Sequence, residues 1–157
     1  MKIVLLMVGK TQTNYLMEGI NEYLKRLKFY LPLEVEVIPD LKNTKSLSFT
    51  QQKEKSSELI INFLQDGDDV ILLDERGREY SSLEFAGFME KKLQLSARRL
   101  VFVIGGAYGF SEKLYARADG KLSVSRMTFS HQMIRLIFVE QLYRAMTIIK
   151  GEPYHHE

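Results

Sequence analysis

The apolar residues of the chain fall into short unbroken runs separated by longer stretches with helical spacing. A run that is apolar at nearly every position is typical of a strand covered on both faces of a sheet. One further segment places glutamates between Leu33, Val35 and Val37, as expected of a half-exposed strand. The predicted strands are Lys2 to Val8, Leu33 to Val37, Val70 to Leu73, Leu100 to Ile104 and Leu122 to Val124.

Helices are predicted between the first four strands. Apolar residues recur with helical spacing from Tyr15 to Leu27. Ser48 followed by Gln51, and Ser81 followed by Glu84, are capping-box patterns, in which two side chains satisfy the first free N–H groups of a helix. The second of these helices is expected to run to about residue 95. The helix after Ser48 is expected to place its apolar residues on one face, at Leu59, Ile60, Phe63 and Leu64.

Two more helices complete the predicted order of elements. A short one follows Ser111, and a long one runs from Met133 to Ile149, where Gly151 and Pro153 end it. Strands and helices therefore alternate along the whole chain, which predicts an α/β fold with a largely parallel sheet and helices on both faces. No linker or repeat divides the 157 residues, so residues 1–157 are expected to form a single domain.

Composition narrows the classes of function. The chain is 45% apolar and 27% charged, as is usual for a soluble globular protein. Its opening strand has about seven apolar residues, too few for a signal peptide or a membrane span. The absence of cysteine excludes disulfides and thiolate metal sites, and it agrees with a cytoplasmic location. No metal is expected.

Positive charge is concentrated in the second half of the chain. Residues 1–90 carry 11 basic and 15 acidic side chains, whereas residues 91–150 carry 11 basic and 3 acidic ones. Charge alone leaves two interpretations open. The basic segment is either a surface that attracts a polyanion such as RNA or a solvated surface whose composition drifts.

Gly105 and Gly106 directly follow the buried strand Leu100 to Ile104. Glycine lets the backbone approach a ligand, and open α/β sheets bind ligands at the C-terminal ends of their strands. A tight turn after the strand is the alternative. The loop lacks the G-x-G-x-x-G spacing, and the chain has no G-x-x-x-x-G-K-[ST], which argues against a Rossmann dinucleotide site and a P-loop.

Several motifs, in order, resemble one family over essentially the whole chain. They are KIVLLMVGK, GINEYLKRL, VFVIGGAYGF, LSVSRMTFSHQMIRLIFVEQLYRA and the terminal GEPYHHE. The resemblance is to the RlmH-type SPOUT methyltransferases. It implies a minimal α/β SPOUT domain with a C-terminal trefoil knot, a homodimer, and S-adenosylmethionine as methyl donor. It also implies methylation of N3 of a pseudouridine in helix 69 of 23S rRNA, in assembled ribosomes.

The resemblance places the cofactor pocket at Leu73, at Gly105 and in the loop of residues 124–129. These positions follow the C-terminal ends of buried strands, where a parallel sheet gathers its loops. Backbone groups of the loop would read the adenine and the methionine carboxylate, and apolar side chains would form walls. For Arg126, a polar contact and a plain surface charge both stay open. The loop residues expected at the cofactor are Val124, Ser125, Arg126, Met127, Thr128 and Phe129.

The C-terminal tail is expected to contain catalytic residues. A terminal pair of histidines can be an expression remnant, but the resemblance extends to Tyr154 and His155 and not to His156. Methyl transfer to N3 requires removal of a weakly acidic imide proton. His155 is the candidate base, because imidazole titrates near neutral pH. Tyr154 would stack on or orient the base, and Arg144 would hold a phosphate or stabilise the imide anion.

The helix from Met133 to Ile149 is apolar on nearly every face. The sheet of one small domain can cover only one side of this helix, so a second subunit is expected to cover the other side. The resemblance implies that RNA and cofactor bind between subunits, with the tail of one chain near the pocket of the other. His131 and Arg135 are candidates to line that interface, and a structural helix-start histidine is the alternative for His131. Ser130 stands where the family usually has proline, and serine is a competent N-cap.

Two other functions stay open at this point. The basic segment alone would permit an RNA-binding or ribosome-associated module without catalysis, which needs no open cofactor pocket. A related SPOUT enzyme that modifies tRNA would usually carry an added RNA-binding domain, for which 157 residues leave no room.

Overall fold

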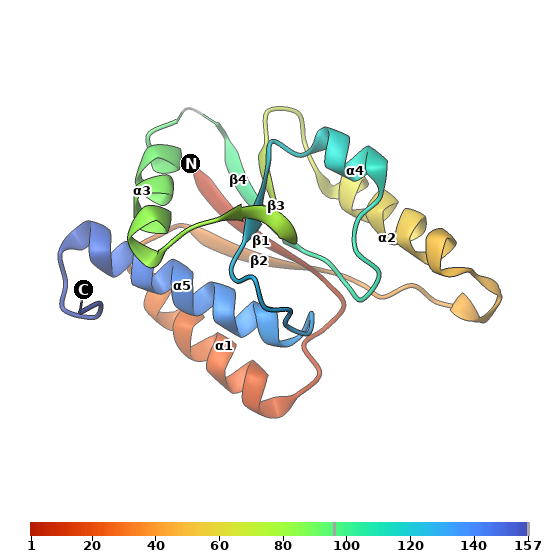
Figure 1. Cartoon of the computed structure of the whole chain (residues 1–157), viewed down its shortest axis with the longest axis horizontal. Coiled ribbons are helices and arrows are strands. Elements are labelled where there is room, and N and C mark those ends of the chain that lie inside the picture. The colour runs from red at the N-terminus through yellow and green to blue at the C-terminus, as the bar shows by residue number, and fades with distance from the viewer. Residues whose placement is uncertain (96, 157) are drawn as a thin grey trace.

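The structure, a computed structural model, describes residues 1–95 and 97–156. Its centre is a sheet of five parallel strands in the order β2-β1-β4-β3-β5 (Figure 1). The strands are β1 (Lys2–Val8), β2 (Leu33–Ile38), β3 (Asp69–Glu79), β4 (Arg99–Ile104) and β5 (Gly120–Ser123). The parallel sheet expected from the alternating pattern is confirmed. The trefoil knot implied by the resemblance stays a prediction.

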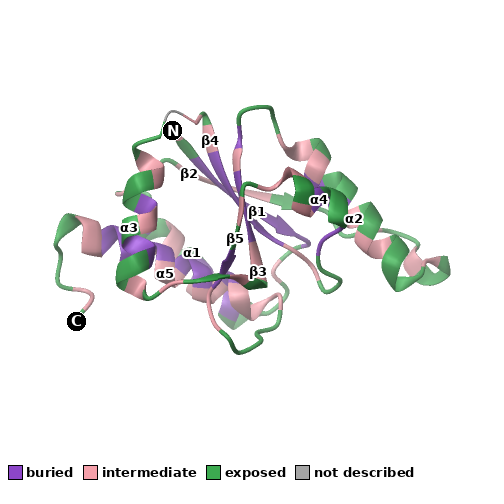
Figure 2. Cartoon of the chain, turned by 45° about the horizontal axis from the view of Figure 1, so that its top comes forward, coloured by how far each residue is buried: buried purple, intermediate pink, exposed green. Residues whose placement is uncertain are grey.

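Helices cover both faces of the sheet, as expected (Figure 1). One face packs against three helices, α1 (Asn14–Leu27), α3 (Ser82–Leu93) and α5 (Met133–Lys150). The other face packs against α2 (Phe49–Phe63) and α4 (Glu112–Arg117), and the short 3-10 helix η1 (Thr44–Ser46) precedes α2. Strand residues point alternately into the two cores, which is why β1 and β4 are apolar and buried after their first residues, Lys2 and Arg99, and appear mostly buried in Figure 2.

Local sequence signals set the helix ends. Ser48 and Ser81 each form a complete capping box, in which the serine side chain accepts the N–H of Gln51 or Glu84 and that residue's side chain accepts the serine N–H. α5 ends at Gly151, whose φ of 70° lies in the left-handed region that glycine adopts without strain. The capping predictions are therefore confirmed.

Four predicted details differ from the structure. Leu59 is 40% exposed, so α2 buries Ile60 and not all four residues expected on one face. β5 begins two residues earlier than predicted, and α3 ends at Leu93. The largest difference is in β3, which continues to Glu79 instead of ending at Leu73.

The extra length of β3 contains an interruption of its pairing with β5. Leu122 pairs first with Leu73 and then with Arg78, so residues 74–77 bulge out of the ladder. Gly77 lies where a Cβ would approach the backbone N of Leu122 to 2.6 Å, so only glycine fits there. Bulges of this kind commonly turn side chains toward functional sites.

α5 is covered more fully than expected. Besides the sheet, α1 and α3 pack along its flanks, and none of residues 133–149 is fully exposed. Apolar residues such as Ile134, Ile137 and Ile148 nevertheless stay partly exposed, so the chain does not cover α5 completely, and the homodimer stays a prediction. Among the described residues, no helix is long and apolar enough to cross a membrane.

Candidate active site

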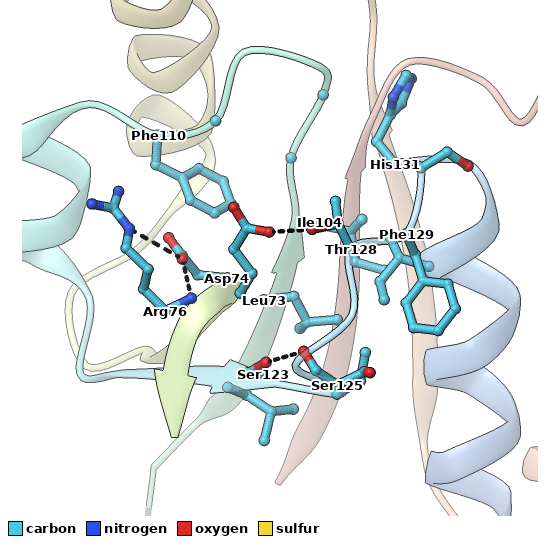
Figure 3. Close-up of a pocket in the computed structure, with 18 of the residues that line it drawn as sticks. Leu73, Asp74, Arg76, Ile104, Phe110, Ser123, Ser125, Thr128, Phe129 and His131 are labelled. Carbon is cyan, nitrogen blue, oxygen red and sulfur yellow. Dashed lines mark hydrogen bonds and ion pairs between the residues drawn. The ribbon is translucent and has the colours of Figure 1, made fainter. Parts of the chain in front are cut away.

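A cavity of about 430 Å³ opens at the C-terminal ends of β3, β4 and β5. Three segments surround it, namely the β3 bulge, the loop after β4 and the loop after β5. Figure 3 shows Asp74 and Phe110 on one side of the cavity and Phe129 and His131 on the other. The walls mix apolar side chains with polar ones, as is usual for small-molecule sites. Its position at the carboxyl ends of adjacent parallel strands is the one expected from the sequence.

The exit of β4 is shaped by Phe110. A Cβ on Gly105 would lie 2.8 Å from Cε1 of the Phe110 ring, whereas a Cβ on Gly106 would be at an ordinary 3.6 Å from Val8. Gly105 therefore lacks a side chain because Phe110, which is buried, packs against its backbone. The room expected there for a ligand is taken by the ring, and the cavity begins beside it.

The β3 bulge supplies two carboxylates to the cavity. The side chain of Asp74 is only 7% exposed. It accepts hydrogen bonds from the Arg76 N–H at 2.8 Å and from the Tyr115 hydroxyl. Burial, together with the bond to Asp74, raises the pKa of Tyr115, so this phenol stays a hydrogen-bond donor at neutral pH. Asp74 is thus held in place at the cavity wall by these two hydrogen bonds.

The second carboxylate bridges two walls. Thr128 Oγ1 donates to Glu75 Oε2 at 2.9 Å, joining the loop after β5 to the bulge (Figure 3). That loop is also tied internally, because Ser123 Oγ donates to the Ser125 carbonyl at 2.8 Å and Ser125 Oγ accepts the Met127 N–H at 2.9 Å. The loop therefore has a defined shape although its Met127 side chain is largely exposed.

Most residues predicted for the cofactor pocket line this one cavity. Arg126 does not line it, because its side chain is 86% exposed and lies 3.9 Å from Glu79. The sequence interpretation missed the bulge residues and the aromatic wall, although the acidic pair directly after a buried strand was a usable signal. The predicted residues at the cavity are Leu73, Gly105, Val124, Ser125, Met127, Thr128 and Phe129, and the missed ones include Asp74, Glu75, Phe110 and Tyr115.

The turn before α5 forms another part of the wall. Ser130 Oγ accepts the Met133 N–H at 3.1 Å, so serine caps the helix as expected. His131 lies at this helix start and also lines the cavity. Arg135 is fully buried inside the chain, donating to the Val8 carbonyl at 2.7 Å and to Thr11 at 3.0 Å. Burial lowers the pKa of Arg135, and the expectation that it lines a subunit interface is wrong.

The predicted catalytic residues form a second cluster, at the other end of α5. Arg144 donates to Glu140 Oε1 from Nη2 at 2.6 Å, and its Nη1 lies 3.1 Å from His155 Nδ1. Tyr154 donates to the same Glu140 oxygen at 3.1 Å, and the Arg144 guanidinium lies 4.7 Å from its ring centre. Glu140, which the sequence interpretation missed, therefore organises Arg144 and Tyr154.

The tail is docked and not frayed. The Tyr154 ring packs edge-on against Tyr143 at 4.8 Å, and its hydroxyl lies 3.3 Å from that of Tyr23 on α1. Tyr30 donates to Glu152 at 2.5 Å, and this hydrogen bond raises the pKa of Tyr30 to about 12. Burial, with help from Tyr23 and Glu140, also raises the pKa of Tyr154, which therefore stays protonated. Glu157, the last tail residue, lies outside the described residues.

The two clusters lie at opposite ends of one helix. His131 and Ile134 line the cavity near the start of α5, whereas His155 follows its end. An α-helix of 18 residues spans about 27 Å. Figure 1 shows the C-terminus at the far end of α5 from the loop after β5. One chain therefore does not bring the predicted catalytic residues to its own cavity.

Comparison with known proteins gives a consistent match. A family model described as "Predicted SPOUT methyltransferase" matches residues 1–155. Proteins named ribosomal RNA large subunit methyltransferase H from Parabacteroides distasonis and Bacteroides thetaiotaomicron are each 60% identical over 157 residues, covering 100% of both chains. A solved structure of a probable methyltransferase from Bordetella pertussis superposes with a TM-score of 0.57 at 11% identity, covering 92% of this chain and 94% of that one. At this low identity, the similarity to the Bordetella structure shows only that the two chains share a fold.

Proposed function

The chain belongs to the SPOUT methyltransferase family, and we propose that it transfers a methyl group from S-adenosylmethionine to 23S rRNA. The proposed target is N3 of a pseudouridine in helix 69 of the assembled ribosome, which would make the enzyme cytoplasmic. The main support for this proposal is that seven of the eight residues predicted to contact the cofactor line one cavity.

The residues at the cavity fit S-adenosylmethionine. The volume, about 430 Å³, lies in the range of small-molecule sites. Leu73 and Ile104 offer apolar surface, the loop of residues 124–129 offers backbone donors and acceptors, and Asp74 and Glu75 suit a ligand that carries positive charge. When bound, S-adenosylmethionine supplies a methyl group on a sulfonium, ready for in-line displacement.

We propose that the working unit is a homodimer with two composite sites. The cavity and the tail cluster lie at opposite ends of α5, so an antiparallel pairing about a two-fold axis would bring the tail of one chain to the cavity of its partner. Each subunit would then contribute one half of each site. This arrangement gives a reason for the separation of about 27 Å that one chain leaves between the two halves.

The tail residues have distinct proposed roles. Arginine only donates hydrogen bonds, so His155 Nδ1 accepts from Arg144 in this contact. Nδ1 can take the N3 proton of the target once the substrate replaces Arg144 as its donor. The displaced Arg144 guanidinium, still held by Glu140, would then stabilise the imide anion. Tyr154, which stays protonated, would orient the base as a donor or by stacking.

Titration calorimetry with S-adenosylmethionine tests the cofactor assignment, and one site per subunit is expected. An RNA-binding module without catalytic activity would not bind S-adenosylmethionine. Methyl transfer should then be measured on ribosomes, on an isolated helix 69 hairpin and on tRNA. Ribosomes are expected to be far better substrates, because so small a chain must recognise a composite surface by shape and charge. Equal methylation of hairpin and ribosome, or preference for tRNA, would contradict the proposed substrate.

A further inference from the structure

A second cleft, of about 280 Å³, lies beside the edge strand β5 on the other flank of the β3 bulge. Arg78 and Tyr80, which follow the bulge, line this cleft, whereas Asp74 and Glu75 within the bulge line the first cavity. Leu122 belongs to the walls of both. The cleft is therefore separate from the cofactor cavity but adjoins it through one segment of β3.

Two cations at this cleft lie against aromatic rings of its wall. The Arg78 guanidinium lies 5.0 Å from the ring centre of Tyr80, and the Lys92 ammonium lies 5.4 Å from that of Phe88. Lys121 also lines the cleft, but its ammonium lies 5.4 Å from the ring centre of Tyr115, which lines the first cavity. Contacts of this kind hold a cation in place without neutralising it, so a cation without a carboxylate partner keeps N–H groups that can bind an anion.

The charges around the cleft do not cancel. Lys92 is paired with Asp69 at 2.7 Å, and Asp119 has Arg117 at 3.5 Å. Within residues 1–95 and 97–156, Arg78 and Lys121 form no ion pair, and both are exposed. Glu84 is also close enough to Arg78 to interact with it electrostatically. Two arginines and two lysines therefore exceed the three carboxylates, those of Asp69, Asp119 and Glu84, by one positive charge.

We propose that this cleft binds the phosphate backbone of the ribosomal RNA substrate, with Arg78 and Lys121 as its contacts. The inference rests on the proposed function, because it supplies the anchor that a domain of this size needs on RNA. Guanidinium and ammonium groups are the usual phosphate ligands, and an open cleft at a sheet edge admits a continuous strand. A chain anchored here lies next to the bulge that forms the cofactor cavity.

The test compares two double variants that each remove two positive charges. R78A/K121A changes the cleft, and K55A/K113A changes exposed lysines on α2 and α4, over the other face of the sheet. Binding of each variant to ribosomes and to isolated 23S rRNA is measured by fluorescence anisotropy from low to high salt. Affinity for S-adenosylmethionine and the melting temperature are measured alongside.

R78A/K121A is expected to bind both RNA targets about ten-fold more weakly at low salt, and its salt dependence should fall by about one unit per charge removed. Cofactor affinity and melting temperature should match those of the wild type, and K55A/K113A should bind RNA as the wild type does. Equal losses in the two double variants would overturn the cleft assignment, as would weaker binding to ribosomes with unchanged binding to isolated 23S rRNA, which would indicate a ribosomal protein. Failure of the wild type to bind ribosomes would instead contradict the proposed function. If R78A/K121A does not fold, R78Q/K121Q provides the same charge change.

Discussion

Arg144 Nη1 lies 3.1 Å from His155 Nδ1, so the expected base and the expected anion-stabilising cation are in direct contact before any substrate arrives. Because arginine has no acceptor, Nδ1 must be unprotonated in this contact. The contact therefore orients the nitrogen that would act as the base. Glu140 holds Arg144 from the opposite side, so the pair cannot drift apart freely.

His155→Ala should lower methyl transfer to ribosomes by at least about ten-fold, because general-base catalysis typically contributes that much or more. The adjacent His156→Ala is the matched control and should change little, since His156 is exposed. Single-turnover rates separate the chemical step from product release. Full activity of His155→Ala would move the base role to water or to a ribosomal group.

Gly105→Val should abolish binding of S-adenosylmethionine. Its branched side chain would collide with the Phe110 ring, which a Cβ would already approach to 2.8 Å, and push that ring into the cavity. Gly87→Val is the control, because Gly87 is exposed away from the cavity and a Cβ there meets nothing within 4 Å. Calorimetry measures both, with thermal melting as the check on folding. Unchanged affinity in a folded Gly105→Val protein would remove this position from the site.

Mixed dimers should regain activity when the two lesions lie in different halves of the composite site. Co-expressed Gly105→Val and His155→Ala chains would pair at random, and one site in each mixed dimer would have an intact cavity and an intact tail, giving about a quarter of the wild-type sites. A mixture of His155→Ala with Arg144→Ala, both in the tail cluster, should regain none. No activity in the first mixture would favour sites built within one chain.

The dimer itself is tested by light scattering, which should give twice the 18.3 kDa chain mass.

Deletion of residues 154–157 should remove methyl transfer while leaving the fold, the dimer and cofactor binding in place. Some stability should be lost, because Tyr154 packs against Tyr143, and an aromatic pair contributes about 0.5 to 1.5 kcal/mol. Tyr154→Phe keeps the ring and tests the hydroxyl bond to Glu140 alone. Loss of cofactor binding on deletion would show that the tail has a structural role at the cavity.

Asp68→Asn should destabilise the protein by about 1.5 to 3 kcal/mol at pH 7, since two hydrogen bonds from Arg99 lose their anionic acceptor. Burial raises the pKa of Asp68, but the bonds from Arg99 and from the Gln65 N–H outweigh burial and hold that pKa below its usual value. The stabilisation is therefore present above the unfolded-state pKa of about 4 and is lost as the pH falls further. Denaturant unfolding from pH 7 to pH 3 should show the difference between the two proteins shrinking. A constant difference would contradict this account.

Local sequence signals were sufficient for much of the fold. Ser48 and Ser81 begin helices because each capping box needs only residues within one turn. The position of the cavity also followed from strand ends, because parallel strands gather their C-terminal loops at one edge. Leu73 and Gly105 therefore lie together as expected.

The features that were missed depend on contacts between distant residues. The β3 bulge exists because Leu122 pairs with both Leu73 and Arg78, which no local pattern encodes. The docking of the tail depends on Tyr23, which is 131 residues away from Tyr154 in sequence. Arginine is usually found at the surface, so the sequence alone gives no reason to expect Arg135 to be buried. Its hydrogen bonds to Val8 and Thr11 explain the burial.

In the proposed two-fold dimer, the length of α5 would set the distance between the tail cluster and the cavity residues at the start of the helix. Each residue added to or removed from this helix would shift the tail by about 1.5 Å and rotate it by about 100° relative to the loop at its start. Both composite sites would then lose their alignment at once, because the same helix sets the spacing in each. Insertions in surface loops are readily tolerated by proteins, but in the proposed dimer the number of residues between Ser130 and Gly151 would have to stay fixed for both sites to work.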